Sequence, residues 1–132
     1  MNHVVARFQD GRILKGQTND FLPARTTFHL VPEGAKAADK PMEVPVPELK
    51  ALFFVRDLAG NPDHKKTNAF DPAKPPQGRK VRVEFKDGEL LIGTTQGYQP
   101  DRPGFFVLPA DGRSNNERCF VVASAVKRVQ MM

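Results

Sequence analysis

The sequence is poor in the residues that build disulfide frameworks and metal sites. It has one cysteine, Cys119, and three histidines among 132 residues. A single cysteine excludes an internal disulfide and any cysteine-rich metal site. The histidines His3, His29 and His64 do not stand at metal-ligand spacings from one another. We therefore expect no metal or other cofactor, and we interpret Cys119, which precedes Phe120, as a small buried apolar residue.

Long apolar runs and catalytic motifs are also missing. No apolar stretch approaches the ~20 residues that span a bilayer, and residues 1–7 lack the charged start and apolar core of a signal peptide. We therefore expect a cytoplasmic protein with no membrane contact. No Gly-rich phosphate loop and no constellation of catalytic side chains is present, so we expect that the protein is not an enzyme.

The charge is basic but spread along the chain. There are 20 Lys and Arg against 15 Asp and Glu, which gives a net charge of +5 and a sequence pI near 9.6. That pI allows a nucleic-acid partner. No run of five or more like charges marks a basic arm, however. The composition alone therefore permits nucleic-acid binding without indicating a site for it.

The strongest pattern in the sequence is an internal repeat. A shift of 77 residues lays residues 3–55 over residues 80–132 without a gap, and 13 of the 53 positions are identical. They include Phe8 and Phe85, and also Gly16 and Gly93, so the turn and its flanks recur. Such a period indicates two copies of one structural unit. We predict one unit in residues 1–57, a Pro-rich connector in 58–79 and a second unit in 80–132.

Each unit has the pattern of a small β-barrel. In the second copy, apolar residues alternate with charged ones over 81–85, as in a strand with one buried face. Asp87-Gly88 is a hairpin signal, and Gly93 inside the next apolar segment indicates a sharp bend. The twelve prolines favour many short segments. The sequence predicts strands at 81–85, 89–95, 105–108, 118–122 and 126–129, and at 4–8, 13–18, 28–31, 42–46 and 49–55.

We therefore predict a mainly β protein made of two tandem five-stranded barrels packed as a pseudo-twofold pair. A unit of ~50 residues is marginally stable alone, so a shared face would stabilise both. Residues 47–52 have an alternative interpretation as a helical turn.

Residues 81–98 resemble the first motif of the Sm-like family: a strand, an Asp-Gly turn and an apolar strand that contains a glycine. Residues 4–21 match it more loosely, and residues 119–129 are similar in outline to the closing strands of the bacterial Sm-like RNA chaperone. The resemblance implies strongly bent Sm-like or SH3-like barrels. The whole chain also resembles an uncharacterised bacterial tandem-repeat domain of unknown function.

The resemblance does not carry the RNA site of the family with it. Where the chaperone has a polar and basic pair that holds uridine-rich RNA, this chain has Ala123-Ser124 in one copy and Val46-Pro47 in the other. The Arg-Gly or Lys-Gly doublet of the second Sm motif is absent as well.

Two loops of the second copy, 97–106 and 111–118, hold the candidate binding residues. An aromatic ring beside arginines and amides is suited to stacking a base or gripping a phosphate. The alternative is that the aromatic rings belong to the core and the asparagines to a tight turn. The candidate ligand- or partner-binding residues are Tyr98, Arg102, Arg113, Asn115, Asn116 and Arg118.

From these observations we expect a non-enzymatic module that binds a protein partner, such as an adaptor domain of a bacterial cytoplasmic protein. The competing hypothesis is a single-stranded RNA- or DNA-binding protein that uses Tyr98, Arg102, Arg113 and Arg118. A cyclic-dinucleotide receptor of the PilZ kind is disfavoured, because residues 111–114 have the wrong spacing for its Asp/Asn-x-Ser-x-x-Gly element.

Overall fold

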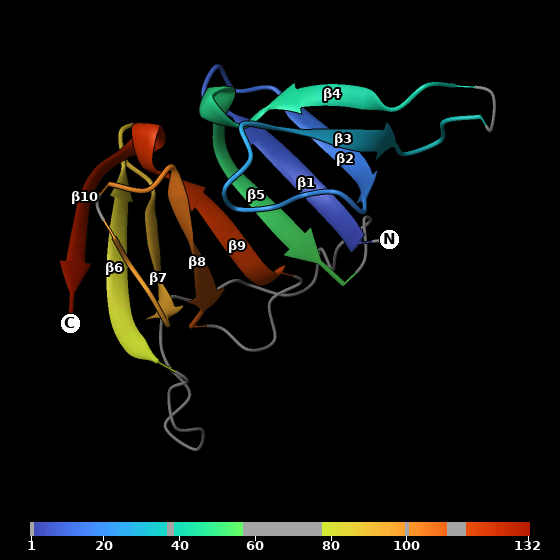
Figure 1. Cartoon of the computed structure of the whole chain (residues 1–132). Helices are drawn as coiled ribbons and strands as arrows, with labels where there is room; N and C mark the ends of the chain where they lie inside the picture. Colours follow the sequence, from blue (N-terminus) through green and yellow to red (C-terminus); the bar gives the residue numbers. More distant parts are fainter. Residues whose placement is uncertain (1, 37–38, 57–77, 100, 111–115) are drawn as a thin grey trace.

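A computed structural model describes residues 2–36, 39–56, 78–99, 101–110 and 116–132. Strands dominate the structure. In each half, one three-residue 3₁₀ turn separates the fourth strand from the fifth (Figure 1). The first half consists of β1 (Asn2–Phe8), β2 (Ile13–Thr18), β3 (Thr27–Pro32), β4 (Met42–Pro45), η1 (Val46–Glu48) and β5 (Leu49–Val55). The second half consists of β6 (Arg79–Phe85), β7 (Leu90–Thr95), β8 (Gly104–Pro109), β9 (Asn116–Val122), η2 (Ala123–Ala125) and β10 (Val126–Met131).

The strands predicted from periodicity are confirmed. In β6, Val81, Val83 and Phe85 are buried, whereas their charged neighbours are exposed or half-buried. The turn after β6 has Gly88 at a φ of 93°, a left-handed conformation that glycine adopts without steric cost. The Asp87 carboxylate accepts a hydrogen bond from the Glu89 N–H in this turn. Local sequence therefore determines the hairpins.

The prediction of two five-stranded barrels packed as a pseudo-twofold pair is wrong. All ten strands form one open antiparallel sheet, in the order β10-β6-β7-β8-β9-β5-β1-β2-β3-β4. Within each half the fifth strand pairs with the first, but it does not close on the fourth. Instead β5 pairs with β9, the fourth strand of the other half. Because the two halves meet through different strands, they are related head to tail rather than by a twofold axis.

The burial of β5 explains why the sheet continues across the two halves. All seven residues of this strand are buried. One face contributes Leu52 and Phe54 to the core of the first half, and the other contributes Ala51, Phe53 and Val55 to the core of the second. A strand with apolar side chains on both faces is stable only when other elements bury both faces. Pairing with β9 places the second half over the otherwise exposed face.

The predicted connector, residues 58–79, lies mostly outside the described residues, which resume at Gly78. Strand β6 begins at Arg79, the last residue of that predicted connector. In the described part of the chain, no helix has the length and apolar character needed to cross a membrane.

Candidate functional site at the junction of the two halves

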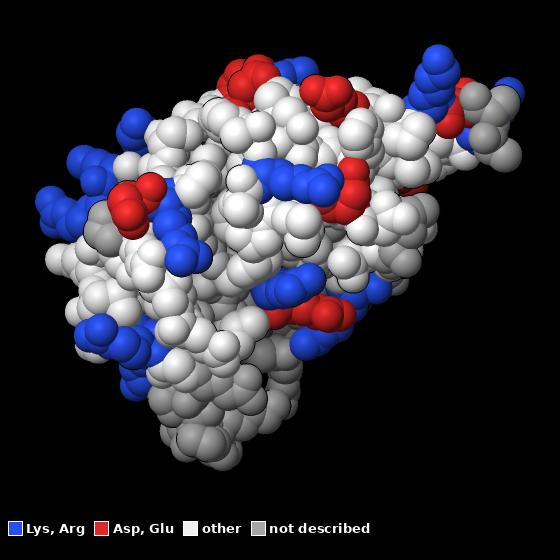
Figure 2. Space-filling model, in the orientation of Figure 1, with Lys and Arg blue, Asp and Glu red and all other residues white. Residues whose placement is uncertain are grey.

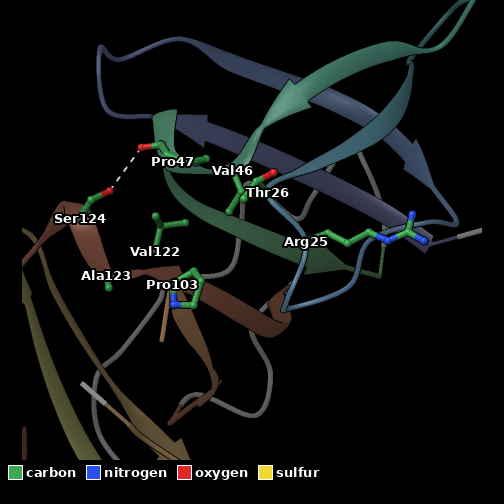
Figure 3. A pocket seen from close by; sticks show the side chains of 8 residues that line it. All are labelled: Arg25, Thr26, Val46, Pro47, Pro103, Val122, Ala123 and Ser124. Atoms are coloured by element: carbon green, nitrogen blue, oxygen red, sulfur yellow. Dashed lines mark hydrogen bonds between the residues drawn. The ribbon is translucent and has the colours of Figure 1, made fainter. Parts of the chain in front are cut away.

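The pairing of β5 with β9, with η1 and η2 at one end of it, forms what we call the junction. A pocket of about 250 Å³ lies at that end (Figure 3). Both halves contribute to its walls, which are mainly apolar. The lining residues are Arg25, Thr26, Val46, Pro47, Pro103, Val122, Ala123 and Ser124.

Backbone hydrogen bonds hold the two walls of the pocket. In the first half the Val46 N–H donates to the Thr26 carbonyl at 2.8 Å. In the second half the Ala123 N–H donates to the Pro103 carbonyl at 2.9 Å. The two donors are 77 residues apart in the sequence, and so are the two acceptors, so the bonds occupy matching positions of the repeat. Each loop is thus fixed to its 3₁₀ turn in the same way, and the pocket walls are held in place before any ligand binds.

Polar side chains connect η1 and η2 beside the pocket. The Ser124 hydroxyl donates to the Pro47 carbonyl at 3.3 Å (Figure 3) and accepts a hydrogen bond from the Gln9 amide at 3.0 Å. The same amide reaches the Pro47 carbonyl at 3.1 Å. These contacts bind the two turns to each other and to the end of β1, so the apolar walls keep a defined separation.

A cluster of ion pairs crosses the junction close to this end. The Lys50 side chain, only 6% exposed, places Nζ 2.7 Å from a carboxylate oxygen of Asp87 and 3.2 Å from one of Glu89. Arg7 also reaches Glu89, at 3.5 Å. The Lys50 ammonium, together with the Glu89 N–H, lowers the pKa of Asp87 from its usual value of 3.8. Charge pairing therefore adds to apolar packing in joining the halves.

This lowered pKa predicts a loss of stability in acid. The unfolded chain takes up protons at a higher pH than folded Asp87 does, so the stabilisation is present above the usual carboxyl pKa and is lost as the pH falls through the folded value. We expect urea denaturation to give a smaller unfolding free energy at about pH 3 than at about pH 6. Asp87→Asn should lower stability at the higher pH and reduce the difference. The control Asp101→Asn, in an exposed turn, should leave this difference in unfolding free energy unchanged. If both variants showed the same difference between the two pH values, Asp87 would not be the source of the pH dependence.

An aromatic cluster fills the first-half side of the junction. The Phe21 ring lies 5.0 Å from that of Phe120 and 5.8 Å from that of Phe54. Phe106 of β8 joins them, with its ring 5.2 Å from Phe120. The guanidinium of Arg118 lies 4.2 Å from the centre of the Phe54 ring, as in a cation–π contact. The rings come from both halves, so this part of the core exists only when the halves are joined.

Two of the candidate residues that the structure describes, Tyr98 and Arg118, lie apart from each other. The Tyr98 ring is half-buried and packs edge-on against Phe105, on the second-half core. Arg118 stacks over Phe54 and Phe106, on the opposite face of the sheet. Adjacent strand residues such as Phe105 and Phe106 face opposite sides, which separates Tyr98 from Arg118.

The other candidate residues are spread out or undescribed. Arg102 is exposed and its Nε donates to the Gln99 side chain at 2.7 Å. Arg113 and Asn115 lie outside the described residues, and Asn116 begins β9 with a side chain that is not described. Among the described candidates, Arg102 alone is the sequence neighbour of a residue that lines the pocket, Pro103.

Sequence reasoning missed the pocket itself, although one signal for it was available. Val46-Pro47 and Ala123-Ser124 occupy matching positions of the repeat, and all four residues line the pocket. Their types gave no indication of a site because they are small or apolar. Over the described ranges, no three His, Cys, Asp or Glu side chains gather closely enough to hold a metal ion.

Comparison with known proteins places the chain in a family. Searches of curated proteins and of solved structures return no match. A family described as "Family of unknown function (DUF6982)" matches residues 1–132, which is the whole length. The chain that carries this ten-stranded sheet and its junction pocket therefore belongs to the DUF6982 family of unknown function.

Proposed function

We propose that this protein is a non-enzymatic binding module, an adaptor of the bacterial cytoplasm, whose junction pocket takes an apolar side chain from a protein partner. The observation that carries the proposal is the pocket with mainly apolar walls that both halves build. Protein interfaces concentrate their binding energy where one partner inserts an anchor side chain into such a pocket. Cys119, the single cysteine of the sequence, is buried and forms no disulfide, which is compatible with a reducing compartment.

The size of the pocket favours a side chain over a free small molecule. Pockets for drug-sized ligands and cofactors hold ~300–1,000 Å³, whereas this one holds about 250 Å³. The walls offer few polar groups to orient a small ligand. A single large apolar side chain, presented by an extended segment, suits both the volume and the chemistry.

The rim of the pocket adds a charge preference. Arg25 lines the pocket with its stem, and its guanidinium points away from the other lining residues (Figure 3). Arg102 is exposed beside Pro103 on the opposite wall. A partner segment with a carboxylate next to its apolar anchor would pair with either arginine.

The competing hypothesis of single-stranded RNA or DNA binding has weaker support at the residues proposed for it. Base stacking requires an accessible ring face, but Tyr98 is half-buried against Phe105. Arg118 is already stacked on two phenylalanine rings. Both groups would have to give up intramolecular contacts to bind a base.

A displayed library of random short peptides, selected on the immobilised full chain, tests the proposal. We expect selected peptides to share a large apolar residue and to lose binding to Ala123→Trp, which fills the pocket. Arg118→Ala, at the other end of the junction, is the control and should retain binding. Circular dichroism confirms that both variants fold.

Two results would refute the proposal. One is selected peptides that bind Ala123→Trp as well as the parent chain. The other is a labelled single-stranded RNA that binds at physiological salt and is weakened by Arg118→Ala, because electrostatic binding to phosphates alone is strongly reduced by salt.

A further inference from the structure

The open sheet ends in two edge strands, β4 and β10. Strand β10 is the fifth strand of the second half, and it occupies the place that β5 occupies in the first. Within the described part of the chain, β10 pairs only with β6, just as β5 pairs with β1 on the corresponding side. On its other side β5 pairs with β9. The matching side of β10 therefore presents an edge of the same kind with no described strand on it.

The pairing of β9 with β5 shows how a strand would add to this edge. Ala51 faces Val121, Leu52 faces Phe120 and Phe53 faces Cys119, in an antiparallel register. A shift of 77 residues transfers these positions of β5 to Arg128, Val129 and Gln130 of β10. A strand added to β10 in this way would run antiparallel to it and would place successive residues against these three side chains.

The side chains of β10 define which residues an added strand needs. Val129 is half-buried and packs on the core of the second half, whereas Arg128 and Gln130 are exposed. A residue opposite Val129 would extend that core and should be apolar. A residue opposite Arg128 would be exposed beside a positive charge and should be acidic.

The surroundings of β10 strengthen the preference for acidic residues. Figure 2 shows Lys and Arg side chains gathered over the end of the molecule where Figure 1 places β6 and β10. Glu84 is the one acidic residue in these two strands, and it lies 3.8 Å from Lys127. The exposed basic residues in β6 and β10 are Arg79, Lys80, Arg82, Lys127 and Arg128.

We propose that the free edge of β10 binds an extended segment of a protein partner in which acidic and apolar residues alternate, and that this segment adds to the sheet as an antiparallel strand. Main-chain hydrogen bonds would supply the affinity, and every second side chain of the added strand would supply the specificity, as in other cases of strand addition. The inference rests on the proposed function only in requiring a protein partner, because this surface is separate from the junction pocket.

A second copy of the chain fits the edge poorly. The second copy also ends in β10 and β4. Pairing β10 with β10 would bring two basic edges together, and pairing β4 with β10 in the register of the junction would set Val44 against Arg128 and Glu43 against Val129. In this second arrangement the residues are mismatched. Each pairing opposes a charged residue to an apolar one. The corresponding pairs inside the junction, Ala51 with Val121 and Leu52 with Phe120, are apolar throughout.

A nucleic acid also fits less well than an acidic strand. The exposed residues of β6 and β10 include no aromatic ring on which a base would stack. Phosphates would satisfy the positive charges, but not the row of N–H and C=O groups along a strand edge.

Titration of the isotope-labelled full chain with a blocked peptide of alternating glutamate and valine tests this proposal. We expect amide shifts concentrated in β10 and slower hydrogen exchange there. Arg128→Glu, a change at an exposed position, should weaken binding about three- to tenfold, as expected for reversing one surface charge. Ala123→Trp, which fills the junction pocket, should leave this binding unchanged, so the two sites are tested separately.

Two control peptides distinguish strand addition from simple charge attraction. The same peptide N-methylated at every second residue keeps its charges but loses the main-chain donors along one edge. Two such peptides, one methylated at the odd positions and one at the even positions, test both edges. We expect at least one of the two methylated peptides not to bind. A lysine and valine peptide should not bind.

The proposal is overturned if both methylated peptides bind as well as the parent peptide, or if the lysine peptide binds equally. It is also overturned if single-stranded RNA displaces the acidic peptide from β10 at physiological salt, or if the free chain self-associates through β10.

Discussion

Replacing Gly93 with alanine should remove a large part of the stability of the protein, about 1–3 kcal/mol or more of unfolding free energy. A Cβ at this position in β7 would overlap the carbonyl oxygen of Leu108 on β8 and would lie 2.7 Å from Cγ1 of Val107. The close approach to Leu108 is to backbone, so a change of rotamer cannot relieve it. Since a domain of this size is stable by only ~5–15 kcal/mol, the loss should be obvious in urea denaturation.

Gly97→Ala is the matched control for this prediction. Gly97 lies four residues further along, and apart from its own residue and its two chain neighbours no atom lies within 4 Å of the position its Cβ would take. We expect this variant to denature at nearly the parent urea concentration. If Gly93→Ala were as stable as Gly97→Ala, the close crossing of β7 and β8 would be incorrect.

Replacing Phe120 with alanine should cost about 3–5 kcal/mol, the usual range for a large buried ring. Phe120 is fully buried, and its ring contacts those of Phe21 and Phe106. It belongs to β9 of the second half but packs in the core of the first. Its removal should therefore destabilise both halves together, in one cooperative transition followed by circular dichroism and by Tyr98 fluorescence.

Glu43→Ala is the control at the matching position of the repeat. Glu43 stands 77 residues before Phe120 in the sequence and is exposed on the edge strand β4. Its replacement should change the unfolding free energy by no more than about 0.5 kcal/mol. Separate unfolding transitions for the two halves in Phe120→Ala, or a cost close to that of Glu43→Ala, would contradict the shared core.

Sequence reasoning was accurate for the strands because their determinants are local. Alternating burial in β6 follows from the alternation of apolar and charged residues over 81–85. Gly93, where a bend was predicted, lies so close to the backbone of Leu108 in β8 that a Cβ would overlap its carbonyl. The three-residue turn η1 (Val46–Glu48) overlaps the start of residues 47–52, for which a helical turn was the alternative.

The arrangement of the two halves depends on a choice that local pattern does not determine. A fifth strand can pair with the fourth strand of its own half or with that of the other, and both choices bury apolar residues. The relevant signal is a contrast between matching positions: Ala51 and Phe53 in β5 correspond to Arg128 and Gln130 in β10. Only β5 is apolar on the face that the other half covers, which marks it as the inner strand and β10 as the edge.

The candidate site was harder to predict for a related reason. From the sequence, Tyr98 and the arginines were the candidates, because an aromatic ring can stack on a base and a guanidinium can bind a phosphate. The pocket instead arises from small and apolar residues that meet only through the β5–β9 pairing. A site formed by such residues has no motif, and it becomes visible only when the strand order is known.

Nuclear Overhauser contacts across β5 test the central claim, that the two halves form one sheet through the junction, most directly. We predict cross-strand contacts from Leu52 to Phe120 and from Phe53 to Cys119, as the register requires. Two separately closed barrels would instead give contacts between β5 and β4, and would give none between β5 and β9. Contacts of that second kind would contradict the continuous sheet and, with it, the pocket that the two halves build together.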